Sequence, residues 1–493
     1  MKIFFAILIL LITVIYMWLR NKHNYWKRQK VETASFKTFY GKNRKHVAFI
    51  IQDIYKRMKV NNKAYIGVYN FITPALIVKD LDLIKAILIT DFETFPDRGF
   101  YSNPHHDPLS TNLVRLSGDM WKKMRQKLTP TFTSGKMKMM FPTVSAIGER
   151  FIETINDQLE NHEAVVEMRD LCARFTTDVI GSVAFGLECN SLKDPLTEFR
   201  IKGDKAFYTI HPLMDALASS YPKFFHKLGF KVFTQELIEF YSQIVRQNVE
   251  MREKDQIKRN DFLDILIELK NKKEDSDDFC LQMEDVIAQA YVFFIGGFET
   301  SSSTMSFALY EMALNPDVQQ KARENVSQVL EKFEGEYSYE SLNEMNYIKQ
   351  VVQETLRKHP VAPTGRRVCR STYTLDGPKA ITIQPGVQII IPVYAIHHDP
   401  DYYPDPERFQ PERFATSLRD QIHSMAYLPF GAGPRTCIAE RFGMMQAMIG
   451  VALLLKNFKF SICPRTPKEL DFDALNVRVF NVKSGIYLKV ERV

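Results

Sequence analysis

A short loop near the C-terminus, Phe430–Ala439, constrains the fold more than any other stretch, because it holds a cysteine in a turn just before a helix-like run. Gly431, Gly433 and Pro434 impose an irregular backbone, since glycine reaches positive φ freely and proline fixes its own φ. Cys437 is therefore expected beside clustered backbone N–H groups and the positive end of a helix dipole, which both favour the thiolate. Such a thiolate serves as a nucleophile, a metal ligand or an axial ligand to haem iron.

Bulk composition places the chain among ordinary globular proteins. It has 493 residues, of which 45% are hydrophobic and 25% charged, enough for one large domain or two to three smaller ones. The net charge of +7 is too diffuse to indicate nucleic acid, and it suits an acidic protein partner or an anionic membrane surface. Six scattered cysteines do not make a disulfide framework, which predicts a reducing compartment.

The N-terminal segment Ile3–Leu19 is apolar apart from Thr13 and Tyr16, about the minimum length that spans a bilayer as a helix. Lys2 alone precedes it, whereas the basic residues that follow at once are Arg20, Lys22, Lys27, Arg28 and Lys30. This bias predicts that the later part of the chain stays in the cytosol. The rival interpretation, a cleaved signal peptide, would place its charge in front and end in a small-residue cleavage site. We therefore expect a single-span anchor over residues 1–19, a basic linker over 20–38 and a folded domain over 39–493.

Apolar periodicity predicts a mainly α fold with small β-sheets (α+β). Helices are expected over 46–58, from 118 onward, over most of 139–269 with breaks near Gly186, Pro195 and Pro222, and over 284–314, 347–359 and 440–455. Short strands are expected over 64–69, 75–78, 372–375, 380–383 and 387–391.

Two adjacent glycines lie inside the expected 284–314 helix, in the sequence Gly296-Gly297-Phe298-Glu299-Thr300. Each glycine costs a helix about 0.5–1 kcal/mol relative to alanine. Close helix packing, with the Thr300 hydroxyl bonded back to the carbonyl of residue 296, is one explanation. The other is a local opening where a small ligand sits beside a proton-delivering pair. The residues alone favour the two equally.

Two pairs at helical spacing also have a structural and a functional interpretation. Trp121 and Arg125, four residues apart, either pack together on the surface or donate to an anionic group of a cofactor. Glu354 and Arg357, three residues apart, form a pair of a kind that is common on helix surfaces. Taken alone, each pair favours the structural interpretation.

In this order and spacing the motifs resemble those of the cytochrome P450 family of haem-thiolate monooxygenases, over nearly the whole chain. Phe430-x-x-Gly433-x-Arg435-x-Cys437 is similar to the family's haem-binding loop. The Gly296–Thr300 stretch is similar to its oxygen-activating helix motif.

Further segments carry the same resemblance. Glu354-x-x-Arg357 and Pro411–Phe414 are similar to the family's Glu-x-x-Arg helix and Pro-Glu-Arg-Phe segment. Trp121-x-x-x-Arg125 is similar to the pair that binds a haem propionate. Leu171–Asp178 resembles insect microsomal members, which are related to vertebrate drug-metabolising enzymes.

The resemblance implies a role for each site residue. Cys437 would be the axial thiolate and metal ligand of haem b, in a loop shared with Phe430 and Gly433. The residues that would bind the propionates are Trp121, Arg125, Arg367 and Arg435, with Arg98 as a further partner. Thr300 and Glu299 would manage protons during oxygen activation. The residues of an implied buried charge network are Glu354, Arg357 and Arg413.

The implied reaction inserts one oxygen atom of O2 into a lipophilic small molecule, either a xenobiotic or an endogenous hormone or lipid. Because no flavin or nicotinamide motif is present, electrons from NADPH would arrive through NADPH–cytochrome P450 reductase, or through a small membrane cytochrome. Basic residues expected to dock an acidic reductase are Lys122, Lys123, Lys127 and Arg441. Segments expected to line an apolar substrate pocket are 100–116, 207–233, Phe293, Phe294, 361–364 and 479–480. The expected location is the endoplasmic reticulum membrane, with the catalytic domain (39–493) on the cytosolic side.

Two departures from the family's pattern leave alternatives open. Ala439 stands where the family usually has glycine, and its methyl group is expected to crowd the helix start against haem. Val31–Lys42 has no proline where microsomal members carry a proline-rich hinge, which puts the membrane orientation or folding efficiency in question. The alternatives are a haem-thiolate isomerase or dehydratase that needs no reductase, and a decayed, non-catalytic haem-binding paralogue. Nucleophile and zinc-ligand roles for Cys437 are disfavoured, because no partner residue can be assigned to either.

Overall fold

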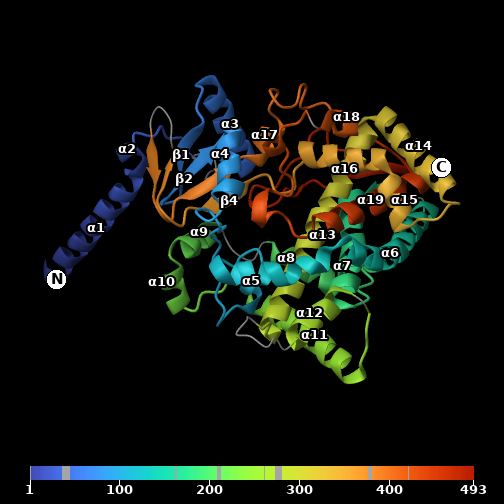
Figure 1. Ribbon diagram of the computed structural model, residues 1–493, viewed down its shortest axis with the longest axis horizontal. Coiled ribbons are helices and arrows are strands. Elements are labelled where there is room, and N and C mark those ends of the chain that lie inside the picture. The colour runs from blue at the N-terminus through green and yellow to red at the C-terminus, as the bar shows by residue number, and fades with distance from the viewer. Residues whose placement is uncertain are drawn as a thin grey trace.

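The computed structural model describes residues 2–35, 45–161, 164–207, 212–259, 261–272, 280–375, 380–419 and 421–493. Helices make up most of it and small sheets lie at its periphery, which confirms the predicted mainly α fold (Figure 1). The α-helices are α1 (Lys2–His23), α2 (Tyr25–Arg28), α3 (Val47–Val60), α4 (Leu81–Lys85), α5 (Gly118–Leu128), α6 (Ser134–Glu160), α7 (Met168–Ile180), α8 (Glu198–Ala206), α9 (Pro212–Ser220), α10 (Pro222–Lys227), α11 (Gln235–Asp255), α12 (Phe262–Asn271), α13 (Met283–Leu314), α14 (Pro316–Lys332), α15 (Tyr339–Glu344), α16 (Asn346–Lys358), α17 (Val393–His397), α18 (Thr416–Arg419) and α19 (Glu440–Asn457). The strands are β1 (Tyr65–Asn70), β2 (Thr73–Val78), β3 (Val165–Glu167), β4 (Gly365–Val368), β5 (Tyr373–Leu375), β6 (Ile381–Ile383), β7 (Gln388–Ile391), β8 (Phe458–Ser461) and β9 (Tyr487–Arg492).

Helix α13 forms the centre of the molecule and packs against α7, α11, α16 and α19 (Figure 1). Its residues are buried on every face from Ser301 to Ala313, although six of these thirteen residues are polar, namely Ser301–Thr304, Ser306 and Glu311. The two glycines do not break it, so α13 runs without interruption past Gly296 and Gly297.

The largest sheet has the order β1-β2-β7-β4. Strand β2 runs parallel to β7, with Leu76 opposite Ile389, and β4 runs antiparallel to β7 on its other side. Strand β4 places Arg366 and Arg367 side by side, and adjacent residues of a strand point to opposite faces. Both arginines nevertheless line the cavity described below.

The chain breaks predicted within 139–269 are confirmed. Gly186 ends one helical stretch with a left-handed φ of 67°, and Pro222 begins α10. Pro142 lies inside α6 without ending it. Strands β3, β4, β8 and β9 were not predicted. The pairing of Val166 in β3 with Leu488 in β9 joins distant segments, which local sequence pattern does not specify.

Helix α1 extends away from the rest of the molecule and is long and apolar enough to cross a membrane (Figure 1). The segment after it is joined firmly to the first sheet. Trp26 is fully buried and donates from Nε1 to the carbonyl of Val68 at 2.9 Å. Gly67 exchanges backbone hydrogen bonds with Glu32 and Ala34, both at 2.9 Å. Residues 36–42 of the proline-free stretch lie outside the described residues.

Candidate active site

A cavity of about 630 Å³ lies beside the middle of α13 and extends to the loop that carries Cys437. Thr300 and Cys437 are both on its wall. The rest of the wall is mostly apolar and includes Phe100, Leu113, Phe132, Phe293 and Val361. The fold thus brings to one cavity the Cys437 loop, the Gly296–Thr300 stretch and the Trp121–Arg125 pair.

The loop 430–439 favours glycine at two positions, because Gly431 has a φ of 74° and Gly433 lies in the same left-handed region. Gly433 has a φ of 71°, and a Cβ there would lie 1.9 Å from the carbonyl oxygen of Leu88. The Cys437 N–H donates to the carbonyl of Phe430 at 2.9 Å, which closes the turn. Ala439 has a φ of −97°, a conformation open to any residue, so the backbone does not require glycine at position 439. The crowding expected at Ala439 therefore has no backbone component.

The Cys437 thiol is deeply placed in this loop. Burial raises its pKa, and this effect outweighs the opposing influence of the Ala439 N–H and the positive charges of Arg98 and Arg125. The sequence analysis named only the influences that favour the thiolate. Those groups are present in the protein, but burial of the sulfur outweighs them, and an iron ion bound at the sulfur would favour the thiolate.

Four arginines surround the Cys437 end of the cavity, and we call Arg98, Arg125, Arg367 and Arg435 the loop cluster. All four line the cavity together with Trp121. Burial, together with the Arg98 charge, lowers the pKa of Arg435 and of Arg367 to about 9. The guanidinium groups of the loop cluster therefore repel one another electrostatically.

Arg435 is held mainly by carbonyl groups. Its guanidinium donates to the carbonyls of Pro96 at 2.8 Å and Leu116 at 3.0 Å, and to the Asp97 carboxylate at 3.1 Å. It also stacks over the Trp121 ring at 3.9 Å. The remaining members bond carbonyls as well: Arg125 to Thr436 at 3.0 Å, Arg98 to Arg435 at 2.9 Å and Arg367 to Arg366 at 2.9 Å.

This arrangement fits an anionic cofactor. Arg435 Nη1 and Arg367 Nε are buried without a hydrogen-bond partner in the described part of the chain. Asp97 is the carboxylate that pairs with the cluster, so the positive charge exceeds the negative. Haem b would fit here, because its propionates could accept from the unpaired donors of Arg435 and Arg367 and the Cys437 sulfur could bind its iron.

On α13, Thr300 and Glu299 take different positions. Thr300 lies on the cavity wall and its Oγ1 donates to the carbonyl of Gly296 at 2.5 Å, the bond that the structural interpretation expected. Glu299 is buried away from the wall and pairs with Arg169 at 2.9 Å. Burial raises the pKa of Glu299 despite that pairing. Gly296 and Gly297 also line the cavity. Both explanations offered for the two glycines, close helix packing and space for a ligand, therefore apply.

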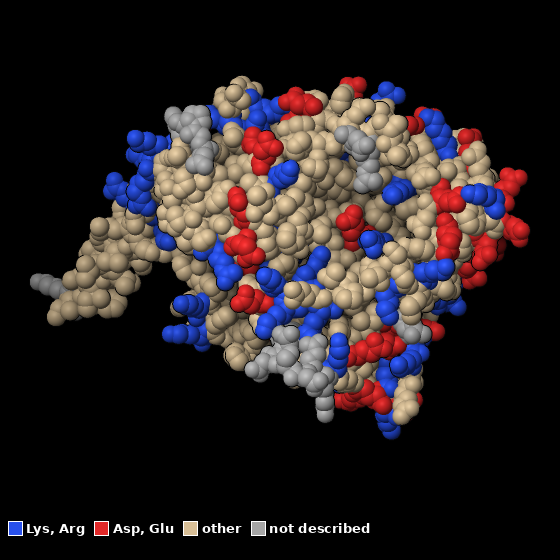
Figure 2. Space-filling model, in the orientation of Figure 1, with Lys and Arg blue, Asp and Glu red and all other residues tan. Residues whose placement is uncertain are grey.

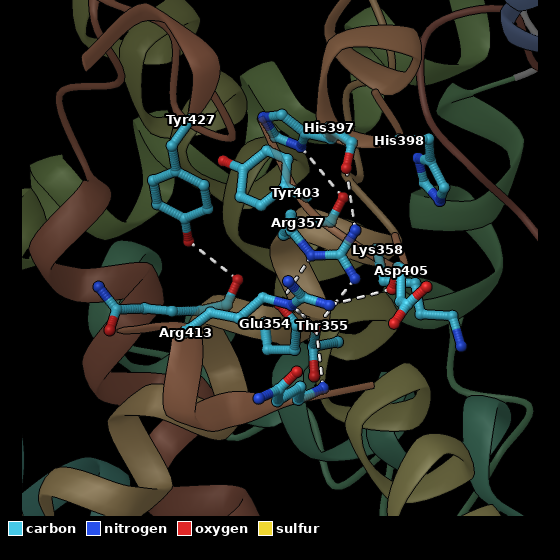
Figure 3. Close-up of polar contacts among 12 residues, drawn as sticks. Glu354, Thr355, Arg357, Lys358, His397, His398, Tyr403, Asp405, Arg413 and Tyr427 are labelled. Carbon is cyan, nitrogen blue, oxygen red and sulfur yellow. Dashed lines mark hydrogen bonds and ion pairs between the residues drawn. The ribbon is translucent and has the colours of Figure 1, made fainter. Parts of the chain in front are cut away.

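The Glu354–Arg357 pair is a buried network and not a surface pair (Figure 3). Both side chains are fully buried and joined by two hydrogen bonds of 2.7 and 2.8 Å. Arg413 lies 3.5 Å from the same carboxylate, as the resemblance implied. Removing one partner of such a pair strands a buried charge, at a cost of about 3–5 kcal/mol.

His397 completes this network, and the sequence analysis assigned it no role. Arg357 Nη1 donates to the His397 carbonyl at 2.9 Å, and His397 Nδ1 lies 3.1 Å from the Arg357 carbonyl. The Leu428 N–H donates to Nε2 at 2.9 Å, which makes Nδ1 the protonated nitrogen. Burial and the Arg357 charge lower the pKa of His397 to about 3. A neutral histidine therefore connects the network to the chain just before the Cys437 loop, a link between distant segments that local sequence pattern does not reveal.

Two expected wall segments are placed elsewhere. Phe294 points away from the cavity and packs against Phe199 at 4.7 Å. Phe480 is fully buried and stacks on Phe472 at 4.1 Å, whereas the residues just before it, Leu475–Arg478, line the cavity. Residues 208–211 of the expected 207–233 segment lie outside the described residues.

Comparison with known proteins agrees with this site. A family model described as Cytochrome P450 matches residues 44–490. The chain is 44% identical to Cytochrome P450 6a8 of Drosophila melanogaster over 100% of this chain and 99% of that protein. It is 41% identical to Cytochrome P450 6a2 of the same organism, over 99% of this chain and 100% of that protein. The cysteine loop, the fit to haem and the full-length similarity show that the chain belongs to the cytochrome P450 family, as a monooxygenase of insect type.

Proposed function

We propose that this enzyme is anchored in the endoplasmic reticulum membrane by α1 and oxidises lipophilic small molecules with electrons from NADPH, delivered by a reductase. The observation that carries the proposal is a single cavity with a mostly apolar wall that contains both the Cys437 thiol and the Thr300 hydroxyl. An apolar wall binds an apolar substrate and excludes water from the reacting atoms.

The residues that would hold the haem are Cys437, Trp121, Arg98, Arg125, Arg367 and Arg435. When bound, a thiolate-ligated haem supplies the redox chemistry that cleaves the O–O bond. Thr300 holds a proton at Oγ1 on the cavity wall. Glu299 is proposed as the proton source behind it, once its carboxyl group separates from Arg169.

The face over α5 is proposed as the reductase contact. Lys122 and Lys123 are exposed on α5, and Arg125 of the same helix bonds the Cys437 loop. Arg441 is exposed at the start of α19 and bonds Ser134 at 3.3 Å. Figure 2 shows basic side chains over α5, whereas acidic side chains gather by α14 and α15. An acidic partner is attracted to the former face.

The test uses the full-length, haem-loaded protein in lipid nanodiscs with a reductase. The reduced, carbon monoxide-bound protein is expected to show the Soret band typical of thiolate ligation, and oxidation of a lipophilic probe is expected to require NADPH. Cys437→Ser should abolish both. Turnover of peroxides without NADPH would instead identify an isomerase or dehydratase. A Soret band typical of ligation without thiolate in the unmodified protein would identify a decayed paralogue.

A further inference from the structure

Residues 111–116, which we call the wall segment, pass beside the cavity from the end of a 3-10 turn (Pro108–Thr111) to the start of α5. Leu113 and Val114 of this segment line the cavity. The segment belongs to no strand or α-helix, so no regular ladder of backbone hydrogen bonds fixes its position. Groups from other parts of the fold therefore have to fix it.

Gln289 of α13 holds the middle of the wall segment through both ends of its side-chain amide. The Leu113 N–H donates to Gln289 Oε1 at 2.9 Å, and Gln289 Nε2 donates to the Thr111 carbonyl at 3.2 Å. Gln289 is fully buried and adjoins the cavity. Because a buried amide without partners is costly, this double contact fixes the register of the wall segment on α13.

Arg115 of the wall segment belongs to a group of three arginines around one aromatic ring, and we call Arg115, Arg366, Arg478 and Asp215 the Phe100 cluster. The central guanidinium carbons lie 5.5, 5.2 and 5.6 Å from the Phe100 ring centroid for Arg115, Arg366 and Arg478, respectively. Arg478 donates to Asp215 at 2.5 Å, and Arg115 lies 3.8 Å from its other oxygen. Burial alone would raise the pKa of Asp215, but the charges of the three arginines lower it below its ordinary value. Ion pairing therefore holds the wall segment at Arg115.

The last residue of the wall segment is bonded to the loop cluster. The Leu116 carbonyl accepts a hydrogen bond from Arg435 Nη2 at 3.0 Å. Charged groups thus hold the segment at Arg115 and Leu116, whereas Leu113, which lines the cavity, is held by the neutral amide of Gln289.

We propose that Gln289 is a positioning residue for the reaction in this cavity, because it holds Leu113 and Val114 as a preformed apolar wall against which the substrate packs. A preformed wall binds a ligand without the conformational entropy that ordering a loop would cost. Gln289 acts through the backbone of the wall segment, to which both ends of its amide are bonded. This inference rests on the proposed function, since it concerns how the proposed substrate cavity is shaped.

The variant Gln289→Glu tests the double contact, because it keeps nearly the same side-chain shape. A protonated carboxyl group can accept from the Leu113 N–H and donate to the Thr111 carbonyl, whereas a carboxylate has no hydrogen to donate. Burial raises the pKa of a carboxyl group, so this change is expected between about pH 6 and about pH 9. Lowering the pH should therefore restore ligand binding to this variant, which a general folding defect would not show.

The full-length ferric haem protein in phosphatidylcholine nanodiscs is titrated with 1-dodecanol, which is uncharged throughout this pH range, in the absence of NADPH. The Soret shift and isothermal titration calorimetry each give the Kd. We expect the Kd of Gln289→Glu to rise about 3- to 10-fold from about pH 6 to about pH 9, and that of the unmodified protein to stay within about twofold. Gln289→Met, which has no amide, should show the higher Kd at both pH values.

Gln319 provides the matched control, because it makes the same double contact on α14, outside the wall of the cavity. Its Nε2 donates to the Phe460 carbonyl at 2.8 Å, and its Oε1 accepts from the Phe460 N–H at 2.9 Å. Gln319→Glu should lower the free energy of unfolding as pH rises, but should leave the Kd of 1-dodecanol unchanged. The titratable groups around the wall segment, Asp107, Arg115 and Asp215, are present in every variant, so their contributions cancel.

A Kd of Gln289→Glu that does not change with pH, or equal losses in Gln289→Glu and Gln319→Glu, would overturn the inference and leave the proposed function in place. Hydrogen–deuterium exchange across residues 111–116 should be faster in Gln289→Met than in the unmodified protein, and unchanged exchange there would also overturn the inference. A protein that shows the pH-dependent Kd but no NADPH-dependent turnover would keep this inference and contradict the proposed function instead.

Discussion

The loop cluster and the Phe100 cluster use the same residue type in the same cavity, but they balance its charge differently. Carbonyl oxygens hold most of the loop cluster and orient its guanidinium groups without neutralising them. The Phe100 cluster contains its own counter-ion, Asp215, on which all three arginines act. Each cluster contains one carboxylate, but Asp97 pairs with Arg435 alone, whereas Asp215 acts on all three arginines of the other cluster. The loop cluster therefore keeps the larger excess of positive charge, which suits a permanently bound anion.

The largest expected effect comes from removing the central arginine of the loop cluster. Arg435→Gln should weaken haem binding about 100-fold and lower the free energy of unfolding by about 3–5 kcal/mol, because Asp97 then loses its partner. Haem content after gel filtration and urea unfolding measure the two effects. Arg465→Gln, which removes an exposed arginine that stacks on Tyr487, is the surface control. Unchanged haem content in Arg435→Gln would remove the distinction between the two clusters.

The Glu354 network differs from both arginine clusters because it contains a histidine, His397, that has to stay neutral. The pKa of His397 is lowered to about 3, below the ordinary value of about 6.5 for an unfolded chain. Between these values the unfolded state binds the extra proton, so stability is present above pH ~6.5 and is lost as pH falls, by about 1.4 kcal/mol per pH unit.

His397→Gln should remove that contribution from the slope of unfolding free energy against pH between about pH 6 and 4. Urea unfolding at several pH values measures the slope. The variant should leave the Kd of 1-dodecanol unchanged at neutral pH, because His397 belongs to neither cluster. An unaltered slope would show that His397 titrates normally in the folded protein.

The smallest expected effect comes from substituting Arg366 or Arg367, which are adjacent on β4. These two substitutions test most directly whether the two arginine clusters are separate sites. Arg367→Gln should weaken haem binding about 10-fold. Arg366→Gln should leave haem binding unchanged, because Arg366 acts on Asp215. Haem titration measures the affinity of both matched variants. Identical behaviour of the two variants would merge the clusters into one site.

Local pattern predicted the parts of the site that short segments specify. The Cys437 loop, the Gly296–Thr300 motif and the Glu354–Arg357 spacing each lie within ten consecutive residues, so they can be recognised in the sequence itself. The Phe100 cluster draws Arg115, Asp215, Arg366 and Arg478 from four distant segments, so only the fold brings them together. The direction of Glu299 and the role of His397 depend on Arg169 and Leu428 in the same way. The pKa of Cys437 also depends on burial, which a local dipole argument does not include.

The join between α1 and the first sheet has a consequence for how the enzyme moves. A Cβ at Gly67 would lie 2.6 Å from the Trp26 ring, so the indole occupies the space that any other residue at that position would need. In the membrane arrangement proposed above, this contact would limit rotation of the folded domain relative to the bilayer normal. The α5 face would then keep a nearly constant height and tilt above the lipid. A reductase in the same membrane would search for that face in two dimensions, with its orientation already restricted before contact.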